Sequence, residues 1–286
     1  VPQTDRLAPH RQLRRFGARG ESRGTMSARV FENVYEILSV QAQERPDAVA
    51  LEDARDLRVS YGQLFAKVGA LIDVLHGLGV GRGARVAIVL PNGVEMAITL
   101  LGVTCVATAV PLNPVYRREE YRAYFDEIRV GFLLTRKGFQ SEARAVASEK
   151  GVPILELSSD GKLELTSDER RPAGSGLAER GDVALVLLTS GSTGRSKKVP
   201  LTHRNICVST RDICWTLALG PADRCLCMWE QFHVGGLVDL LLVPLASGGT
   251  VICAGGFDAA RFYELLEAKQ PTWFQGVPTT LNELSV

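Results

Sequence analysis

The sequence reads Leu187-Leu-Thr-Ser-Gly-Ser-Thr-Gly-Arg-Ser-Lys-Lys-Val199 at its most informative point. Residues 183–188, at the start of this stretch, are all apolar and predict a buried β-strand. Each residue from Thr189 to Gly194 is glycine or carries a hydroxyl group, and two lysines follow. Glycine lets backbone N–H groups close around a phosphate, hydroxyls add donors and lysine adds charge. The pattern predicts a polyphosphate-binding loop, with an ordinary solvated surface loop as the alternative.

Two better-known loops do not fit this stretch. A Walker A loop that starts at Gly191 needs a second glycine where Ser196 stands and a hydroxyl where Lys198 stands. A nucleophile elbow needs a glycine two residues before its serine, and neither Ser190 nor Ser192 has one. The sequence therefore indicates neither loop.

The stretch does resemble the phosphate loop of the adenylate-forming enzymes, a family of acyl-CoA synthetases, adenylation domains of peptide synthetases and luciferases. That loop reads roughly [YF]-T-S-G-[ST]-T-G-x-P-K-G-V, followed by T/S-H-x-N. The chain departs from it at Ser196, where proline is usual, and at Lys198, where glycine is usual. The matching residues are Thr189, Ser190, Gly191, Ser192, Thr193, Gly194, Lys197, Val199, Thr202, His203 and Asn205.

Other segments resemble the same family, in the family's order. The segment Gly79–Asn92 departs from the family's pattern at Ala84, where an acidic residue is usual. The matching segments are Gly79–Asn92, Ala109–Pro114, Phe232-His-Val-Gly-Gly236 and Thr272–Thr279.

The resemblance implies a chemistry. A carboxylate attacks the α-phosphorus of ATP, pyrophosphate leaves with the help of Mg2+, and the acyl-adenylate passes its acyl group to the thiol of coenzyme A or phosphopantetheine. Thr189 would end the strand and Lys197 would contact a phosphate as a point charge, whereas Lys198 is interpreted as a solvated neighbour. The β- and γ-phosphates would be cradled by Ser190, Gly191, Ser192, Thr193 and Gly194.

Two histidines need separate interpretations. A histidine among apolar residues is more often a packing residue than a catalyst. The resemblance nevertheless implies that His233 approaches the substrate carboxylate at the mouth of an acyl pocket, so we assign it a catalytic role. His203 is instead expected to cap or orient the start of a helix beside Asn205.

Three functions stay open at this point. The first is an acyl-CoA or acyl-carrier ligase that acts on a small carboxylic acid, and the Phe232-His-Val-Gly-Gly236 pattern favours it. The second is an amino-acid-activating module of a peptide synthetase. The third is a non-catalytic nucleotide-binding piece. Because the family normally continues well past this point, we expect an incomplete N-terminal portion that is inactive alone.

Composition excludes several classes of protein. A formal net charge of +1, with dispersed lysines and arginines, argues against a nucleic-acid partner. The apolar run Leu237–Leu245 is interrupted by Asp239 and Pro244, so no membrane span is predicted. The six cysteines lie among apolar neighbours without a C-x-x-C pair, which indicates reduced thiols, no metal site and a cytoplasmic protein.

Strands and helices alternate along the chain, which favours parallel, doubly wound sheets. Together with the resemblance, this predicts an α/β fold with two doubly wound, mostly parallel sub-domains, a truncated version of the family's large N-terminal domain. We expect a disordered basic leader, or sequence upstream of the natural start, over residues 1–25. The first sub-domain is expected over 26–170 and the second, with the phosphate loop, over 171–286.

Overall fold

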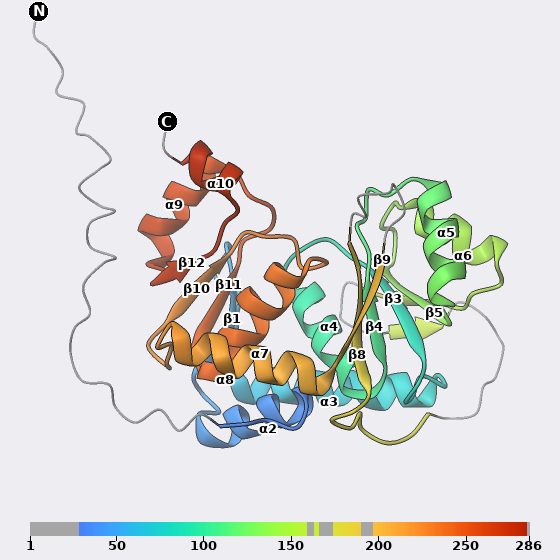
Figure 1. The fold of residues 1–286 in the computed structure, drawn as a ribbon, viewed down its shortest axis with the longest axis horizontal. Helices are drawn as coiled ribbons and strands as arrows, with labels where there is room; N and C mark the ends of the chain where they lie inside the picture. The colour runs from blue at the N-terminus through green and yellow to red at the C-terminus, as the bar shows by residue number, and fades with distance from the viewer. Residues whose placement is uncertain (1–28, 159–162, 166–173, 190–196, 285–286) are drawn as a thin grey trace, which may run out of the picture.

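The computed structural model describes residues 29–158, 163–165, 174–189 and 197–284. Within these residues the strands form two sheets, and most neighbouring strands in each are parallel (Figure 1). The predicted α/β class with two mostly parallel, doubly wound sheets is confirmed. The predicted leader over residues 1–25 lies outside the described residues.

The larger sheet has seven strands among the described residues. Its outer pairs β6–β7 and β8–β9 are antiparallel, and the strands between them are parallel. In spatial order the strands are β7 (Leu163–Leu165), β6 (Ile154–Leu157), β5 (Phe132–Arg136), β3 (Arg85–Val89), β4 (Thr108–Pro111), β8 (Val183–Thr189) and β9 (Lys197–Thr202).

The smaller sheet has five strands in the same part of the chain. Its pair β1–β2 is antiparallel and the others are parallel. In spatial order the strands are β12 (Trp273–Phe274), β10 (Arg224–Cys227), β11 (Thr250–Cys253), β1 (Val49–Asp53) and β2 (Arg58–Ser60).

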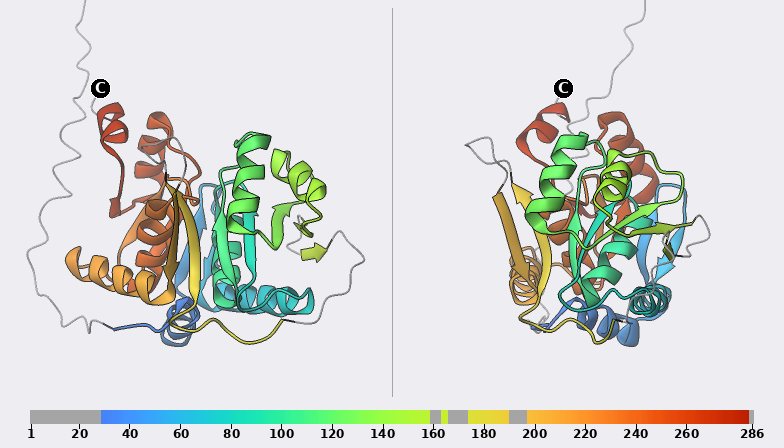
Figure 2. Two further views of the ribbon diagram at one scale, coloured as in Figure 1. Left: turned by 45° about the vertical axis from the view of Figure 1, so that its right-hand side comes forward. Right: turned by 90° about the vertical axis from the view of Figure 1, so that its right-hand side faces the viewer.

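The helices pack in layers around the two sheets (Figures 1 and 2). One large core joins α2, α3, α4, α8 and the π-helix to the facing sides of both sheets. A second core packs α5 and α6 on the outer face of the larger sheet, and a third packs α9 on the outer face of the smaller one. The helices are α2 (Val34–Glu44), α3 (Tyr61–Gly77), α4 (Val94–Val106), α5 (Arg118–Ile128), α6 (Glu142–Glu149), α7 (His203–Thr216), a π-helix (Gly235–Leu242), α8 (Val243–Ser247), α9 (Ala259–Lys269) and α10 (Pro278–Glu283).

Local sequence explains where several helices begin. Ser60 and Gln63 form a reciprocal capping box at the start of α3, and Thr202 and Asn205 form another at the start of α7. Helix α4 is apolar on nearly all sides, so it lies in the central layer between the sheets. None of the helices in the described ranges is both long enough and apolar enough to cross a membrane.

The division into sheets differs from the predicted division of the chain at residue 170. Strand β1 pairs in parallel with β11, and β4 pairs in parallel with β8. The smaller sheet therefore takes its β1–β2 hairpin from the first half of the chain, and the larger sheet takes β8 and β9 from the second. The limits 26–170 and 171–286 do not coincide with the limits of the sheets.

Candidate active site

The predicted phosphate loop begins and ends on the β8–β9 hairpin. Thr189, the last residue of β8, is paired in register with Lys197, the first residue of β9. Both residues are exposed at the edge of the larger sheet where its parallel strands end. Ligands of open α/β sheets bind outside this carboxyl edge. The other predicted loop residues, Ser190, Gly191, Ser192, Thr193 and Gly194, lie outside the described residues.

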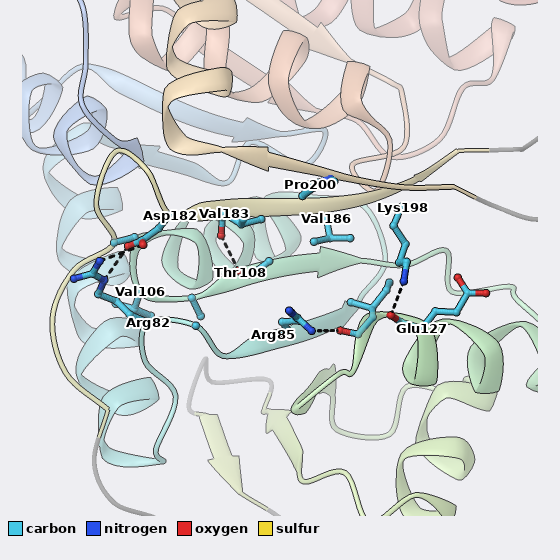
Figure 3. Close-up of a pocket in the computed structure, with 14 residues that line it drawn as sticks. Arg82, Arg85, Val106, Thr108, Glu127, Asp182, Val183, Val186, Lys198 and Pro200 are labelled. Atoms are coloured by element: carbon cyan, nitrogen blue, oxygen red, sulfur yellow. Dashed lines mark hydrogen bonds and ion pairs between the residues drawn. The ribbon is translucent and has the colours of Figure 1, made fainter.

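The two adjacent lysines differ in position. Successive side chains of a strand point to opposite faces, so Lys197 and Lys198 cannot share one environment. Lys198 Nζ donates a hydrogen bond of 2.8 Å to the carbonyl oxygen of Glu127 at the end of α5 (Figure 3). The side chain of Lys198 is exposed, as expected of a solvated neighbour, and it has this backbone carbonyl as a partner. A cation at the carboxyl end of a helix interacts favourably with the helix dipole.

A cavity of about 470 Å3 lies beside this lysine, between the outer face of the larger sheet and α5 (Figure 3). The basic side chains that line it already have partners. Arg85 donates to the carbonyl of Ile128 at 2.7 Å, and Arg82 donates to both carboxylate oxygens of Asp182 at 2.8 and 3.1 Å. The hydrogen bond with Arg82 holds the pKa of Asp182 below its usual range. Because its cations are engaged, we interpret this cavity as structural.

His233 lies on the loop between β10 and the π-helix. Its backbone N–H donates to the carbonyl of Glu230 at 3.1 Å, and its carbonyl accepts from Leu237 N–H at 3.0 Å. The imidazole is exposed and its ring centre lies 4.6 Å from that of Phe232. The side chain is therefore accessible to a ligand, whereas its predicted contact with a substrate carboxylate stays a prediction.

Two glycines after His233 allow this loop to pack closely. A Cβ atom on Gly235 would lie 2.4 Å from the ring of Trp229, and one on Gly236 would lie 2.2 Å from the carbonyl oxygen of Glu230. A side chain at either position would push the π-helix away from the loop. π-Helical turns are rare and often occur at functional sites. The close packing of this loop therefore requires glycine at positions 235 and 236.

Sequence reasoning missed Gln231, which joins the two sheets at their carboxyl edges. Gln231 Oε1 accepts from the backbone N–H of Gly93 at 2.9 Å, and Gln231 N–H donates to Asn92 Oδ1 at 3.0 Å. Gly93 has φ of 145°, a conformation that favours glycine, and it caps α4 directly after β3. In the sequence, the Pro91-Asn92-Gly93 turn after an apolar strand was the one sign of this contact. The turn does not show that Gln231 is its partner.

His203 is completely buried at the start of α7. Its Nδ1 accepts from Val34 N–H at the start of α2 at 3.3 Å. Burial lowers the pKa of His203 to about 4, against the opposing effects of the Thr104 backbone and the Asp182 carboxylate. The ring is therefore neutral at physiological pH. It ties α7 to α2, while Thr202 and Asn205 make the cap.

A second cavity, of about 250 Å3, opens at the carboxyl ends of β10 and β12. Aromatic rings of Trp229, Phe257, Phe262 and Phe274 line it, and polar groups from the adjoining loop and α10 complete it. Its lining residue Gln275 donates from Nε2 to Asp239 Oδ2 of the π-helix at 3.0 Å. No local sequence pattern brings these four rings together, because they come from stretches that are far apart in the chain.

The described residues contain no group of three His, Cys, Asp or Glu side chains that is arranged to hold a metal ion. All six cysteines are free and buried. Cys227 and Cys253 are register partners on neighbouring strands, and burial raises the pKa of the Cys227 thiol to about 12. These thiols are protonated packing residues at physiological pH.

Comparison with known proteins agrees with this geometry. A family model described as AMP-binding enzyme matches residues 38–285. The chain is 32% identical over 266 residues to the probable CoA ligase CCL9 of Humulus lupulus, covering 85% of the chain and 48% of that protein. It is 32% identical over 260 residues to an oxalate–CoA ligase of Saccharomyces cerevisiae, covering 78% of the chain and 48% of that protein.

The fold is also that of a solved structure. The ATP-bound structure of MatB from Rhodopseudomonas palustris matches with a TM-score of 0.75 at 26% identity, covering 88% of this chain and 51% of that one. The chain thus spans about half the length of the curated relatives and solved structures that it matches. With a family model matched over most of its length, the chain belongs to the AMP-binding, adenylate-forming enzyme family.

Proposed function

We propose that the complete gene product carrying this chain activates a carboxylic acid with ATP and transfers the acyl group to a thiol. The observation that carries the proposal is that both candidate segments lie at the carboxyl edges of the two sheets. The Thr189–Lys197 end of the β8–β9 hairpin lies at one edge, and the loop with His233 follows β10 at the other. The hydrogen bonds of Gln231 to Asn92 and Gly93 hold these edges together.

The chain's residues would act by position and charge. Adenylation needs the acid carboxylate beside the α-phosphorus and compensation for charge on the departing pyrophosphate. Lys197 would contribute one positive charge, and the backbone and hydroxyl groups of residues 190–194 would hold the β- and γ-phosphates. Mg2+ would arrive with the nucleotide and neutralise phosphate charge. His233, exposed at the loop, would orient the acid carboxylate.

The thiol acceptor we favour is coenzyme A. The names of the relatives, which include CoA ligases, support this choice. The phosphopantetheine of a carrier protein and the peptide-synthetase reaction remain the alternatives. Six free, buried cysteines support a reducing compartment, so we place the protein in the cytoplasm.

Carboxylate-dependent exchange of pyrophosphate into ATP tests the proposal. The complete gene product should catalyse exchange with a panel of carboxylic acids, and the exchange should stop when the acid is omitted. Release of AMP on addition of coenzyme A would identify the second half-reaction. An intact protein that binds ATP but exchanges pyrophosphate with none of the acids would contradict the proposal.

A further inference from the structure

The turn that carries His233 is fixed by a buried glutamine. We propose, on the basis of the proposed function, that Gln231 is a positioning residue for adenylation: its bonds to the Asn92–Gly93 turn set where His233 lies at the carboxyl edge, and Gln231 itself does not contact the reacting atoms. Three observations carry this inference, namely the geometry of the turn, the direction of the bonds and the rigidity of their anchor.

His233 is the last residue of a four-residue turn. Its backbone N–H donates to the carbonyl of Glu230 at 3.1 Å, so Gln231 and Phe232 are the two central residues. On the other side, the carbonyl of His233 accepts from Leu237 N–H at 3.0 Å and joins the turn to the π-helix. Because the residues of a closed turn move together, a bond that holds Gln231 also holds the backbone of His233.

Gln231 is attached through both its side chain and its backbone. Its Oε1 accepts from Gly93 N–H at 2.9 Å, and its own N–H donates to Asn92 Oδ1 at 3.0 Å. The side-chain oxygen, and not the amide nitrogen, must face Gly93, because two donors would repel one another. Gln231 is 1% exposed, so water has little access to these bonds. The two bonds form a reciprocal clamp, in which the side chain of each turn binds the backbone of the other.

The anchor of this clamp is part of the central core. Gly93 lies shortly after the end of β3 and caps α4, where its carbonyl accepts from Ala97 N–H at 3.0 Å. Helix α4 is buried between the two sheets. A turn bound to this helix cannot shift without moving core side chains, which are packed too closely to yield. The clamp therefore transfers the rigidity of the core to the position of His233.

A shift of this turn should cost rate rather than the fold. Adenylation depends on holding the acid carboxylate beside the α-phosphorus, and a misplacement of about 1 Å can cost about a hundredfold in rate. Gln41 offers the matched comparison, because it is 4% exposed and its Nε2 donates to the Ala246 carbonyl at 2.9 Å, which joins α2 to α8. Gln41 is thus a buried glutamine that joins two elements, but it is not on the turn that carries His233.

Pyrophosphate exchange in the complete gene product measures the effect on rate. Gln231→Met keeps the length of the side chain and removes the acceptor for Gly93, so kcat should fall about ten- to a hundredfold while the KM for ATP stays within about twofold. Asn92→Ala removes the other bond and should lower kcat as well. Gln41→Met should leave kcat within about twofold of the parent. In a His233→Ala background, Gln231→Met should cause no further loss, because it acts through His233.

The position of His233 can also be measured without activity. The chain has four histidines, so its imidazole signals can be resolved by NMR and assigned with His233→Ala. The His233 ring lies 4.6 Å from the Phe232 ring, whose ring current should displace the His233 signals from those of an unfolded chain. Gln231→Met should move these signals toward those of the urea-unfolded chain, and Gln41→Met should leave them in place.

Three results would overturn the inference. These are an unchanged kcat in both Gln231→Met and Asn92→Ala, equal kinetic losses in Gln231→Met and Gln41→Met, and His233 signals that do not move in Gln231→Met. The proposed function has a separate outcome. If the complete gene product exchanges no pyrophosphate, the proposed function fails, while the NMR comparison still decides whether Gln231 positions His233.

Discussion

At the scale of single residues, neighbours in sequence can have different tasks. Lys197 and Lys198 carry the same charge on the same strand, yet β-strand geometry places them on opposite faces. The Nζ of Lys198 donates a hydrogen bond to the carbonyl oxygen of Glu127 at the end of α5. Lys197 makes no ion pair with other described residues. Lys197 is therefore the lysine that we propose to contact a nucleotide phosphate.

Lys197→Ala should weaken ATP use about ten- to a hundredfold, the equivalent of one charge-assisted hydrogen bond of about 1.5–3 kcal/mol. Lys198→Ala should leave the KM for ATP within about twofold, because its ammonium already binds a backbone carbonyl. The measurement is ATP-dependent pyrophosphate exchange in the complete gene product. Both variants lose one positive charge, so equal kinetic losses would indicate a general electrostatic effect and contradict the assignment of Lys197.

His203 should make the free energy of unfolding depend on pH. Its pKa is about 4 in the folded chain and about 6.5 when unfolded, so the unfolded state binds more protons between these values. Stability should therefore be full above pH 6.5 and fall as the pH drops toward 4. The loss between pH 7 and pH 5 should be about 2 kcal/mol from this group.

Urea unfolding of the chain and of His203→Gln at pH 7 and pH 5 isolates this contribution. The variant should be less stable at pH 7, because the bond to Val34 changes, but it should lose about 2 kcal/mol less than the parent on acidification. The pKa of Asp182 is also below its usual value, so its contribution to stability is lost as the pH falls through that lowered pKa. The hydrogen bond with Arg82 that chiefly lowers this pKa is present in both proteins, so it does not account for a difference between them. A parallel pH profile for the two proteins would show that His203 is not the titrating group.

At the scale of elements, the sequence predicted those whose apolar pattern is local and continuous. Residues 183–188, predicted as a buried strand, lie within the observed β8, Val183–Thr189. Strand β9 was missed because its sequence Lys-Lys-Val-Pro-Leu-Thr has little apolar alternation. It exists through pairing with β8, at the edge of the sheet where proline is tolerated.

The parts of the candidate site that depend on local sequence could also be predicted. Thr189 ends β8, Lys197 begins β9, and His233 lies in the loop after β10, so their placement at a carboxyl edge could be expected. The role of Gln231 could not, because its partners Asn92 and Gly93 lie nearly 140 residues away. The aromatic cavity likewise depends on three separate stretches, residues 226–230, 257–262 and 274–283, coming together.

The π-helix offers a prediction at this scale. Gly235→Ala should destabilise the chain by about 1–3 kcal/mol, because the new methyl group overlaps the Trp229 ring. Gly69→Ala is the matched control, since it lies in α3 with nothing within 4 Å of the position that a Cβ would take, and it should stabilise the chain by about 0.5–1 kcal/mol. Thermal unfolding measures both. A Gly235→Ala variant as stable as the parent would show that the loop and π-helix separate easily.

At the scale of the whole molecule, the two halves of the chain are interlocked. Glu52 on β1 is almost completely buried and lies 3.0 Å from both Lys269 of α9 and Arg224 of β10. Its pKa is below its usual value although burial alone would raise it, because Lys269 and Arg224 hydrogen-bond to it. A carboxylate from the first half of the chain is thus neutralised by cations from the second.

This interlocking predicts the behaviour of a divided chain. Residues 29–170 contain β1 without its parallel partner β11, and β4 without β8, whereas residues 171–286 contain the complementary strands. Each half alone would expose strand edges and apolar faces, and in the first half Glu52 would lack Lys269 and Arg224, which leaves Arg58 as its partner. We expect neither half to show a cooperative thermal transition alone, and their mixture to form a one-to-one complex that does. Circular dichroism melts and sizing chromatography would measure this, with the uncut chain as the reference. A cooperative transition in isolated residues 29–170 would instead identify the predicted sub-domain of residues 26–170 as an independent folding unit, because only a half that completes its own sheet and neutralises its own buried charge can unfold cooperatively.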